Sequence, residues 1–134
     1  MTVVAENPAL SLRAVRFVEP LLGFDQVDSF TLAPIDPNGL LYSMRSTDDP
    51  GLRFVLAPPE GFFADYLPSL DDTVGDTLGA SEVEVLVMIT VVSGLDDATA
   101  NLRAPIVFAP STGRAVQVVL DDDSLPMHQP LIIR

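Results

Sequence analysis

Carboxylates occur side by side at several points of the chain, as Asp48-Asp49, Asp71-Asp72, Asp96-Asp97 and Asp121–Asp123. Two neighbouring carboxylates can act as general acid and general base when burial moves their pKa values apart. Each of these pairs stands in a stretch typical of a turn, where water surrounds the side chains. We therefore expect solvated turns. A hydrolase would need one of these carboxylates buried with a raised pKa.

The other catalytic residue types predict no site. His128 is the only histidine, and the chain contains no G-x-S-x-G sequence to supply the nucleophile of a Ser-His-Asp triad. It has no cysteine, which excludes disulfides, thiolate metal sites and cysteine catalysis. Neither a calcium-binding loop nor a phosphate-binding glycine loop occurs. We expect no enzyme and no cofactor, and we expect His128 to lie on the surface or at an interface.

The charge balance constrains the partners. Nineteen acidic residues stand against seven arginines, and the formal net charge is −12. Such a surface repels a polyanion, so direct nucleic-acid binding is not expected. A basic protein partner fits this charge, because opposite charges speed encounter. A role in solubility alone explains the charge equally well.

Length and hydropathy predict one domain. The chain has 134 residues, of which 48% are hydrophobic, as in a globular protein. Residues 1–8 lack a basic region followed by an apolar run, so no targeting signal is expected. The longest apolar run, residues 85–92, is too short to span a bilayer. We expect a cytoplasmic protein without a membrane partner.

Short apolar runs between turn signals predict strands. The strongest turn is Asp36–Gly39, where proline presets φ and Asn38-Gly39 tolerates a positive φ. The clearest strand is residues 81–92, which is rich in β-branched side chains. The predicted strands are residues 12–19, 29–35, 40–46, 52–58, 81–92, 102–109 and 114–120.

The region between the fourth and fifth predicted strands differs. Residues 58–70 are rich in proline and aromatic residues, which indicates an ordered loop or an edge. Phe62 and Tyr66 are either core plugs or interface anchors, and the plug is favoured. Residues 71–79 predict a short helix, capped by Asp71 or Asp72 and ended by Gly79, although Gly75 weakens it.

These elements together predict an all-β fold. We expect a small antiparallel β-barrel-like domain with at most one short helix. A parallel α/β sheet is disfavoured because no long helix is predicted. One domain is expected over residues 1–134, with residues 1–10 and 124–134 irregular.

A series of stretches carries a family resemblance. In chain order they are "LLGF" (21–24), "RSTDDPGLRFVLAPP" (45–59), "DY" (65–66), "TANLRAPIV" (99–107), "QVVL" (117–120) and "PMHQPL" (126–131). Together they resemble the FliW family of flagellar assembly factors and cover nearly the whole chain. Two places depart from the family pattern. Residues 19–24 replace a Gly-Leu-Pro-Gly-Phe-type turn, and Met44-Arg45-Ser46 replaces Leu-Gln-Ser, which indicates a divergent branch.

The resemblance implies a compact β-barrel-like fold without catalytic activity, acting as a partner switch. Members of the family bind CsrA, an mRNA-binding translational repressor, and keep it off the flagellin message. Flagellin that accumulates in the cell binds the factor and frees the repressor, and export of flagellin resets the switch.

Polar residues before the predicted strand at residue 102 give a candidate partner surface. We expect Thr99 and Asn101 to fix a tight turn through side-chain to backbone hydrogen bonds. That turn would present hydrophobic and basic residues beside the acidic rim Asp96-Asp97. For Asn101 a purely architectural turn is an equal alternative. The candidate partner-binding residues are Thr99, Asn101, Leu102, Arg103, Pro105, Asp48, Asp49, Phe62, Tyr66, Asp96 and Asp97.

Two alternatives to the partner switch stay open. The first is a chaperone that binds flagellin and has lost the repressor. The second is a barrel for a small ligand, which would need an apolar cavity with a few converging polar groups.

Overall fold

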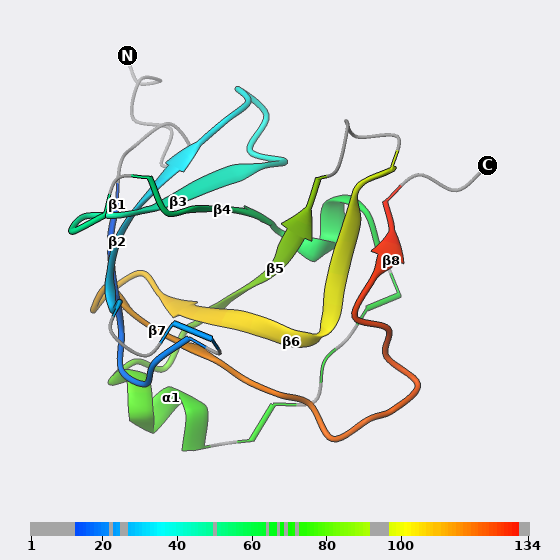
Figure 1. Cartoon of the computed structure of the whole chain (residues 1–134). Coiled ribbons are helices and arrows are strands. Elements are labelled where there is room, and N and C mark those ends of the chain that lie inside the picture. Colours follow the sequence, from blue (N-terminus) through cyan, green and yellow to red (C-terminus); the bar gives the residue numbers. More distant parts are fainter. Residues whose placement is uncertain are drawn as a thin grey trace, which may run out of the picture.

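The computed structural model traces the whole chain (Figure 1). It describes residues 13–21, 23–24, 27–49, 51–63, 65–66, 68, 70–71, 73–91 and 97–131. The predicted irregular segment 1–10 lies outside these residues.

Strands dominate the described chain. They are β1 (Arg13–Phe17), β2 (Ser29–Pro34), β3 (Tyr42–Ser46), β4 (Arg53–Ala57), β5 (Glu84–Thr90), β6 (Thr99–Ala109), β7 (Arg114–Gln117) and β8 (Gln129–Pro130). Between β4 and β5 lie a 3-10 turn, η3 (Pro59–Gly61), and a short α-helix, α1 (Thr73–Leu78).

The sheet closes on itself. Its strand order is β5-β4-β3-β2-β1-β7-β6, and β5 also pairs with β6, so β1 to β7 form a closed barrel. β8 pairs with the first residues of β6, on the edge opposite β5. The predicted all-β barrel with one short helix is therefore confirmed. Its strands pair antiparallel except for β1 and β7, which run parallel.

Local turn chemistry sets two of the hairpins. Oδ1 of Asp36 accepts hydrogen bonds from the backbone N–H groups of Leu40 (2.9 Å) and Leu41 (2.8 Å). Gly39 takes a φ of 73°, as the predicted turn requires. In the β3–β4 turn the buried hydroxyl of Ser46 accepts from the backbone N–H groups of Asp48 and Asp49. These side chains replace the ladder bonds that a turn lacks.

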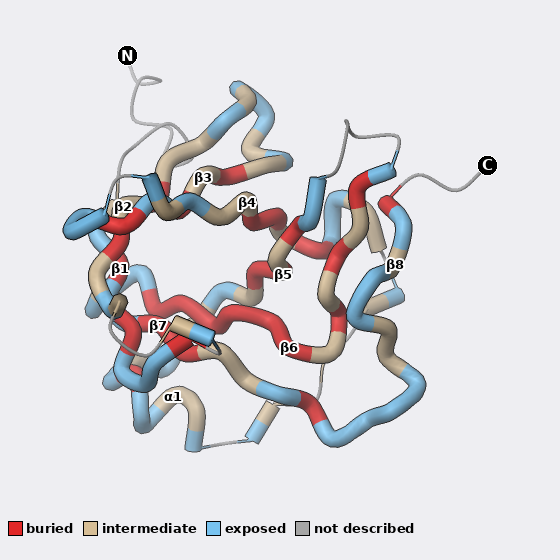
Figure 2. The backbone as a smooth tube through the Cα atoms, in the orientation of Figure 1, coloured by how far each residue is buried: buried red, intermediate tan, exposed pale blue. Residues whose placement is uncertain are grey.

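Alternating apolar side chains fill the barrel. Figure 2 shows buried segments running along the strands that surround the interior. Phe17 and Phe30 meet edge to face, with ring centroids 5.5 Å apart. The side chains of this main core are Val15, Phe17, Leu21, Phe30, Leu32, Tyr42, Met44, Leu56, Leu86, Ile106, Phe108 and Ala115.

A second cluster lies outside the main core, beneath the aromatic loop. Phe62, Phe63 and Tyr66 pack against residues that include Val87, Ile89, Leu102 and Leu131. The plug interpretation of the aromatic loop is therefore confirmed.

The predicted helix is also confirmed, with shorter bounds. Oδ1 of Asp71 accepts from the backbone N–H of Thr73, and Gly79 ends the helix with a φ of 71°. A Cβ on Gly75 would lie 2.8 Å from the carbonyl oxygen of Ala80, which explains a glycine inside the helix. Leu78 is fully buried against the outside of β6 and β7.

Several predicted strand boundaries are wrong, including the start of the strand predicted from residue 81, which begins at Glu84. β6 begins at Thr99 instead of Leu102, because β5 on one side and β8 on the other pair with residues 99–100. The predicted strand 114–120 ends at Gln117. Residues 118 and 120 nevertheless donate backbone hydrogen bonds to Pro105 and Arg103. The tail, expected to be irregular, supplies the short strand β8.

Candidate functional site

β6 turns a corner within its length (Figure 1). On β5 the pairing passes from Leu86 to Met88, while on β6 it passes from Ile106 to Asn101, so residues 102–105 leave the β5 ladder. Oδ1 of Asn101 accepts from the backbone N–H groups of Arg103 and Ala104, each at 3.1 Å. The Asn101 side chain thus satisfies donors that the interrupted ladder leaves without a partner.

The prediction of a tight turn fixed by Thr99 and Asn101 is therefore wrong in part. Asn101 makes the predicted side-chain to backbone bonds, but at a bend inside a strand, and Thr99 pairs with Thr90 and Pro130. Leu102 is only 6% exposed and Pro105 is fully buried, so the corner does not present these two on the surface. Leu102 packs in the cluster beneath the aromatic loop.

Arg103 holds the segment that follows β7 against the corner of β6 through hydrogen bonds. Its Nε donates to the carbonyl oxygen of Leu125 (3.0 Å) and its Nη2 donates to that of Asp123 (2.8 Å). Its own carbonyl oxygen accepts from the backbone N–H of Leu120 at 2.8 Å. A half-buried guanidinium with backbone partners is a positioning group, and here it holds residues 120–125 against β6.

Tyr66 links the aromatic loop to the same corner through a hydrogen bond. Its hydroxyl donates to the carbonyl oxygen of Leu102 at 2.6 Å. Burial raises the pKa of Tyr66 to about 12, because the phenolate would lose hydration. The residue is therefore a neutral donor over the whole physiological pH range.

A groove of about 430 Å³ lies between the aromatic loop and residues 120–125. Asp65, Asp121 and Asp122 supply its carboxylates and are all exposed. Leu120 and Leu125 supply most of its apolar floor, and Leu120 is only 8% exposed. The residues that line this acidic groove are Asp65, Tyr66, Pro68, Leu120, Asp121, Asp122 and Leu125.

Ser124 stabilises the ionised form of one groove carboxylate, that of Asp122. The hydroxyl and the backbone N–H of Ser124 both donate to Oδ1 of Asp122, at 2.6 and 3.0 Å. These bonds hold the pKa of Asp122 below its ordinary value. An apolar floor under ionised carboxylates suits a partner that brings a basic side chain next to an apolar one.

The structure brings together some of the candidate residues and separates others. Asn101, Leu102 and Arg103 build the corner, and Tyr66 lines the groove. Asp48 and Asp49 are exposed in the β3–β4 turn and do not line the groove, and Phe62 belongs to the plug.

The remaining acidic candidates lie just before β6. Asp97 is exposed, and Asp96 lies outside the described residues. Whether any of the candidate residues contacts a partner stays a prediction.

Sequence reasoning missed Asp65, Leu120, Asp121, Asp122 and Leu125. Two signals pointed at them: the acidic run Asp121–Asp123 directly after an apolar strand, and the pair Asp65-Tyr66. Neither signal says that the two segments meet, because they meet through their bonds to the corner of β6, which is distant from both in sequence.

The chemistry that a hydrolase would need is missing from the described residues. The described members of the carboxylate pairs are all exposed. The pKa of Asp71 lies below its ordinary value, as that of Asp122 does, whereas a catalytic acid needs a raised pKa. Within the described part of the chain no group of three or more histidine, cysteine, aspartate or glutamate residues could hold a metal ion. His128 is exposed, as expected.

Comparison with known proteins gives a single answer. A sequence profile of the family described as FliW protein matches residues 4–131. The chain belongs to the FliW family. It is 38% identical to the flagellar assembly factor FliW of Syntrophotalea carbinolica over 119 residues, which cover 87% of this chain and 85% of that protein. It is 37% identical to flagellar assembly factor FliW 2 of Desulfotalea psychrophila, covering 86% and 78% of the two chains.

The fold agrees with this family assignment. The crystal structure of a flagellar assembly factor FliW superposes with a TM-score of 0.80 at 31% identity, covering 90% of this chain and 86% of that one. The general role of the chain is thus that of a flagellar assembly factor. Among the described residues, no helix has the length and apolar character needed to cross a membrane.

Proposed function

We propose that this FliW-family protein is a cytoplasmic partner switch without enzymatic activity. It binds a CsrA-type translational repressor and releases it when flagellin binds. Release lets the repressor return to the flagellin message, so translation of flagellin falls when free flagellin accumulates. Family membership supports the role in flagellar assembly, and the acidic groove supports a basic protein as one partner.

The acidic groove is the observation on which the proposal rests. An RNA-binding repressor must carry positive charge to neutralise phosphates. The groove offers Asp65, Asp121 and Asp122 around an apolar floor, within a chain of net charge −12. Complementary charge speeds encounter, and the buried apolar contact holds the complex. A repressor docked in this groove has part of its positive charge covered, and that charge is no longer available to bind RNA.

Isothermal titration calorimetry tests the switch. The whole chain is titrated with the CsrA-type repressor and with flagellin from the same bacterium, at about 50 mM and about 300 mM salt. We expect both partners to bind, flagellin to displace the repressor, and repressor binding to weaken at high salt. Binding of flagellin alone would contradict the switch and leave a flagellin chaperone. Binding of neither would contradict the proposed function as a whole.

A further inference from the structure

Most described arginines have a partner within the chain. Arg13 Nη1 lies 3.8 Å from a carboxylate oxygen of Glu84, and the guanidinium lies 5.4 Å from the centroid of the Phe108 ring. Arg103 donates to two backbone carbonyls. Arg114 lies against Gly79, at the carboxyl end of α1 where a positive charge is favourable.

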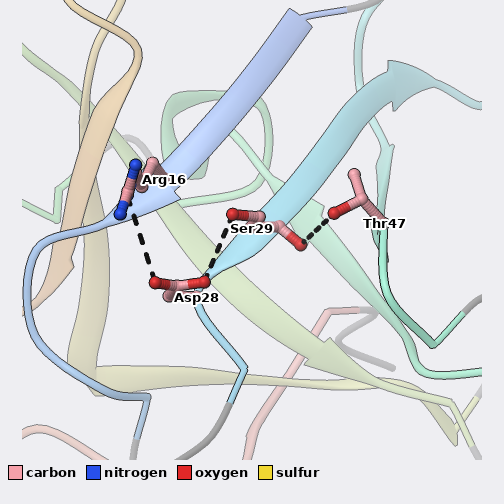
Figure 3. Close-up of polar contacts among 4 residues, drawn as sticks. All are labelled: Arg16, Asp28, Ser29 and Thr47. Carbon is pink, nitrogen blue, oxygen red and sulfur yellow. Dashed lines mark hydrogen bonds and ion pairs between the residues drawn. The ribbon is translucent and has the colours of Figure 1, made fainter.

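Arg16 also has a counter-charge. Its Nε lies 4.0 Å from Oδ2 of Asp28, and the hydroxyl of Ser29 donates to Oδ1 of the same carboxylate at 3.2 Å. The hydroxyl of Thr47 donates to the carbonyl oxygen of Ser29 (Figure 3). Arg16 stands in register with Arg114 across β1 and β7, so this arginine pair carries a neutralising carboxylate.

A second arginine pair lacks a neutralising carboxylate. Arg45 on β3 and Arg53 on β4 face each other in the antiparallel ladder, and both are exposed. Arg53 Nε donates to the hydroxyl of Ser43 at 2.9 Å, a neutral partner. Among the described residues the ion pairs are those of Arg13 and Arg16, so neither Arg45 nor Arg53 has a carboxylate within 4.0 Å.

The described acids nearest in sequence lie in the adjoining turn and form no ion pair with these arginines. Asp48 and Asp49 stand in the turn that joins β3 to β4, and Oδ1 of Asp49 accepts from the backbone N–H of Gly51. Like charges directly opposite each other in a sheet are destabilising. A guanidinium stays charged in proteins, so the pair cannot relieve this repulsion. The uncompensated pair is therefore a local cost to the folded chain.

Polar side chains lie beside the pair. Thr31 on β2 stands in register with Arg45, and Ser43 stands on the same face of the sheet. We call Thr31, Ser43, Arg45 and Arg53 the arginine face. Two planar guanidinium forks side by side match two carboxylates, each of which can accept two parallel hydrogen bonds.

We propose that the arginine face docks an acidic segment of a partner protein, with adjacent carboxylates on Arg45 and Arg53. A carboxylate segment is favoured over RNA because the net charge of −12 opposes a polyanion along its whole length. A segment of a few acidic residues needs only the local pair. This surface is separate from the acidic groove, since the two share no residue.

Fluorescence anisotropy tests the proposal at about 50 mM salt, with a labelled octapeptide that carries two adjacent glutamates among glycines and serines. Wild-type protein is compared with Arg45→Gln/Arg53→Gln and with the matched control Arg16→Gln/Arg114→Gln. Both variants lose two positive charges from a cross-strand pair. Thermal unfolding checks that all three proteins are folded, which the exposure of Arg45 and Arg53 makes the expected result.

We expect the first variant to bind the peptide at least about tenfold more weakly than wild type, and the control to differ by less than about threefold. Equal losses in the two variants, or no peptide binding by wild type, would overturn the proposal. Tighter binding of an eight-nucleotide single-stranded RNA that depends on the same arginines would also overturn it, in favour of a nucleic acid. The experiment uses neither repressor nor flagellin, so its failure leaves the proposed function untouched.

Discussion

The acidic groove and the arginine face differ in sign and in construction. The groove joins Asp65, Tyr66 and Pro68 to residues 120–125, and both segments bond to the corner of β6. The arginine face comes mainly from one hairpin, β3–β4, whose register places Arg45 opposite Arg53. We infer that the groove depends on tertiary contacts, whereas the arginine face needs only the hairpin on an intact barrel.

The largest effect is expected from Phe108→Ala, which empties part of the shared core. Phe108 is 2% exposed, and its loss should lower the free energy of unfolding by about 3–5 kcal/mol through lost burial and a cavity. Urea denaturation measures this, and both surfaces should weaken together. A change below about 1 kcal/mol would show that the core is not packed as described.

The second-largest effect is expected from Asn101→Ala, at the corner of β6. Removing Oδ1 leaves two backbone N–H groups without their acceptor, which should cost about 1–3 kcal/mol. Repressor binding should fall, while binding of the two-glutamate peptide to the arginine face stays at the wild-type value. Asn101→Asp is the matched control, because it keeps an acceptor at this position. Lost partner binding with an unchanged melting temperature would instead show that Asn101 contacts the partner.

Much of the fold follows from local sequence. The turn at Asp36–Gly39 and the helix cap at Asp71 were predicted because the side chains that make them lie within a few residues of the groups they bind. The corner of β6 was predicted as a turn, since the bonds of Asn101 are local and turn-like. Its place inside a strand depends on pairing with β5 and β8, which local pattern does not contain.

The two surfaces were not predicted, for different reasons. The groove requires Tyr66 to meet Leu102, 36 positions apart in the chain. The arginine pair could in principle be predicted, because Arg45 and Arg53 are equally spaced about residues 47–51, which separate the predicted strands 40–46 and 52–58. Such symmetry predicts opposition only if the turn sets the register, which the structure confirms.

A smaller effect is expected from Tyr66→Phe, which removes one hydrogen bond from the groove wall. The free energy of unfolding should fall by about 0.5–1.5 kcal/mol. The difference in ultraviolet titration between wild type and the variant should show a phenol with a pKa near 12.

Burial of Tyr66 favours its neutral form, so this contribution to stability is complete below the ordinary pKa of 10.0. It is lost as pH rises towards 12. A phenol that titrates at 10.0 would contradict the described burial.

The smallest effect is expected from Ser124→Ala on the groove rim. Without the Ser124 hydroxyl, the pKa of Asp122 should rise towards its ordinary 3.8, which carboxyl-carbon NMR titration measures. In wild type the lowered pKa gives stability that is present above the ordinary value and is lost as pH falls through the folded pKa. Repressor binding at neutral pH should not change, because Asp122 is ionised in both proteins.

The most direct test of the account removes charge from the groove alone. Asp65→Asn/Asp121→Asn and the matched control Glu19→Gln/Glu82→Gln each remove two exposed negative charges, but only the first pair lines the groove. Repressor binding is measured by calorimetry at low salt. We predict that the groove variant binds at least about fivefold more weakly and that the control binds within about twofold of wild type. Equal binding by the two variants would contradict the groove as the docking surface.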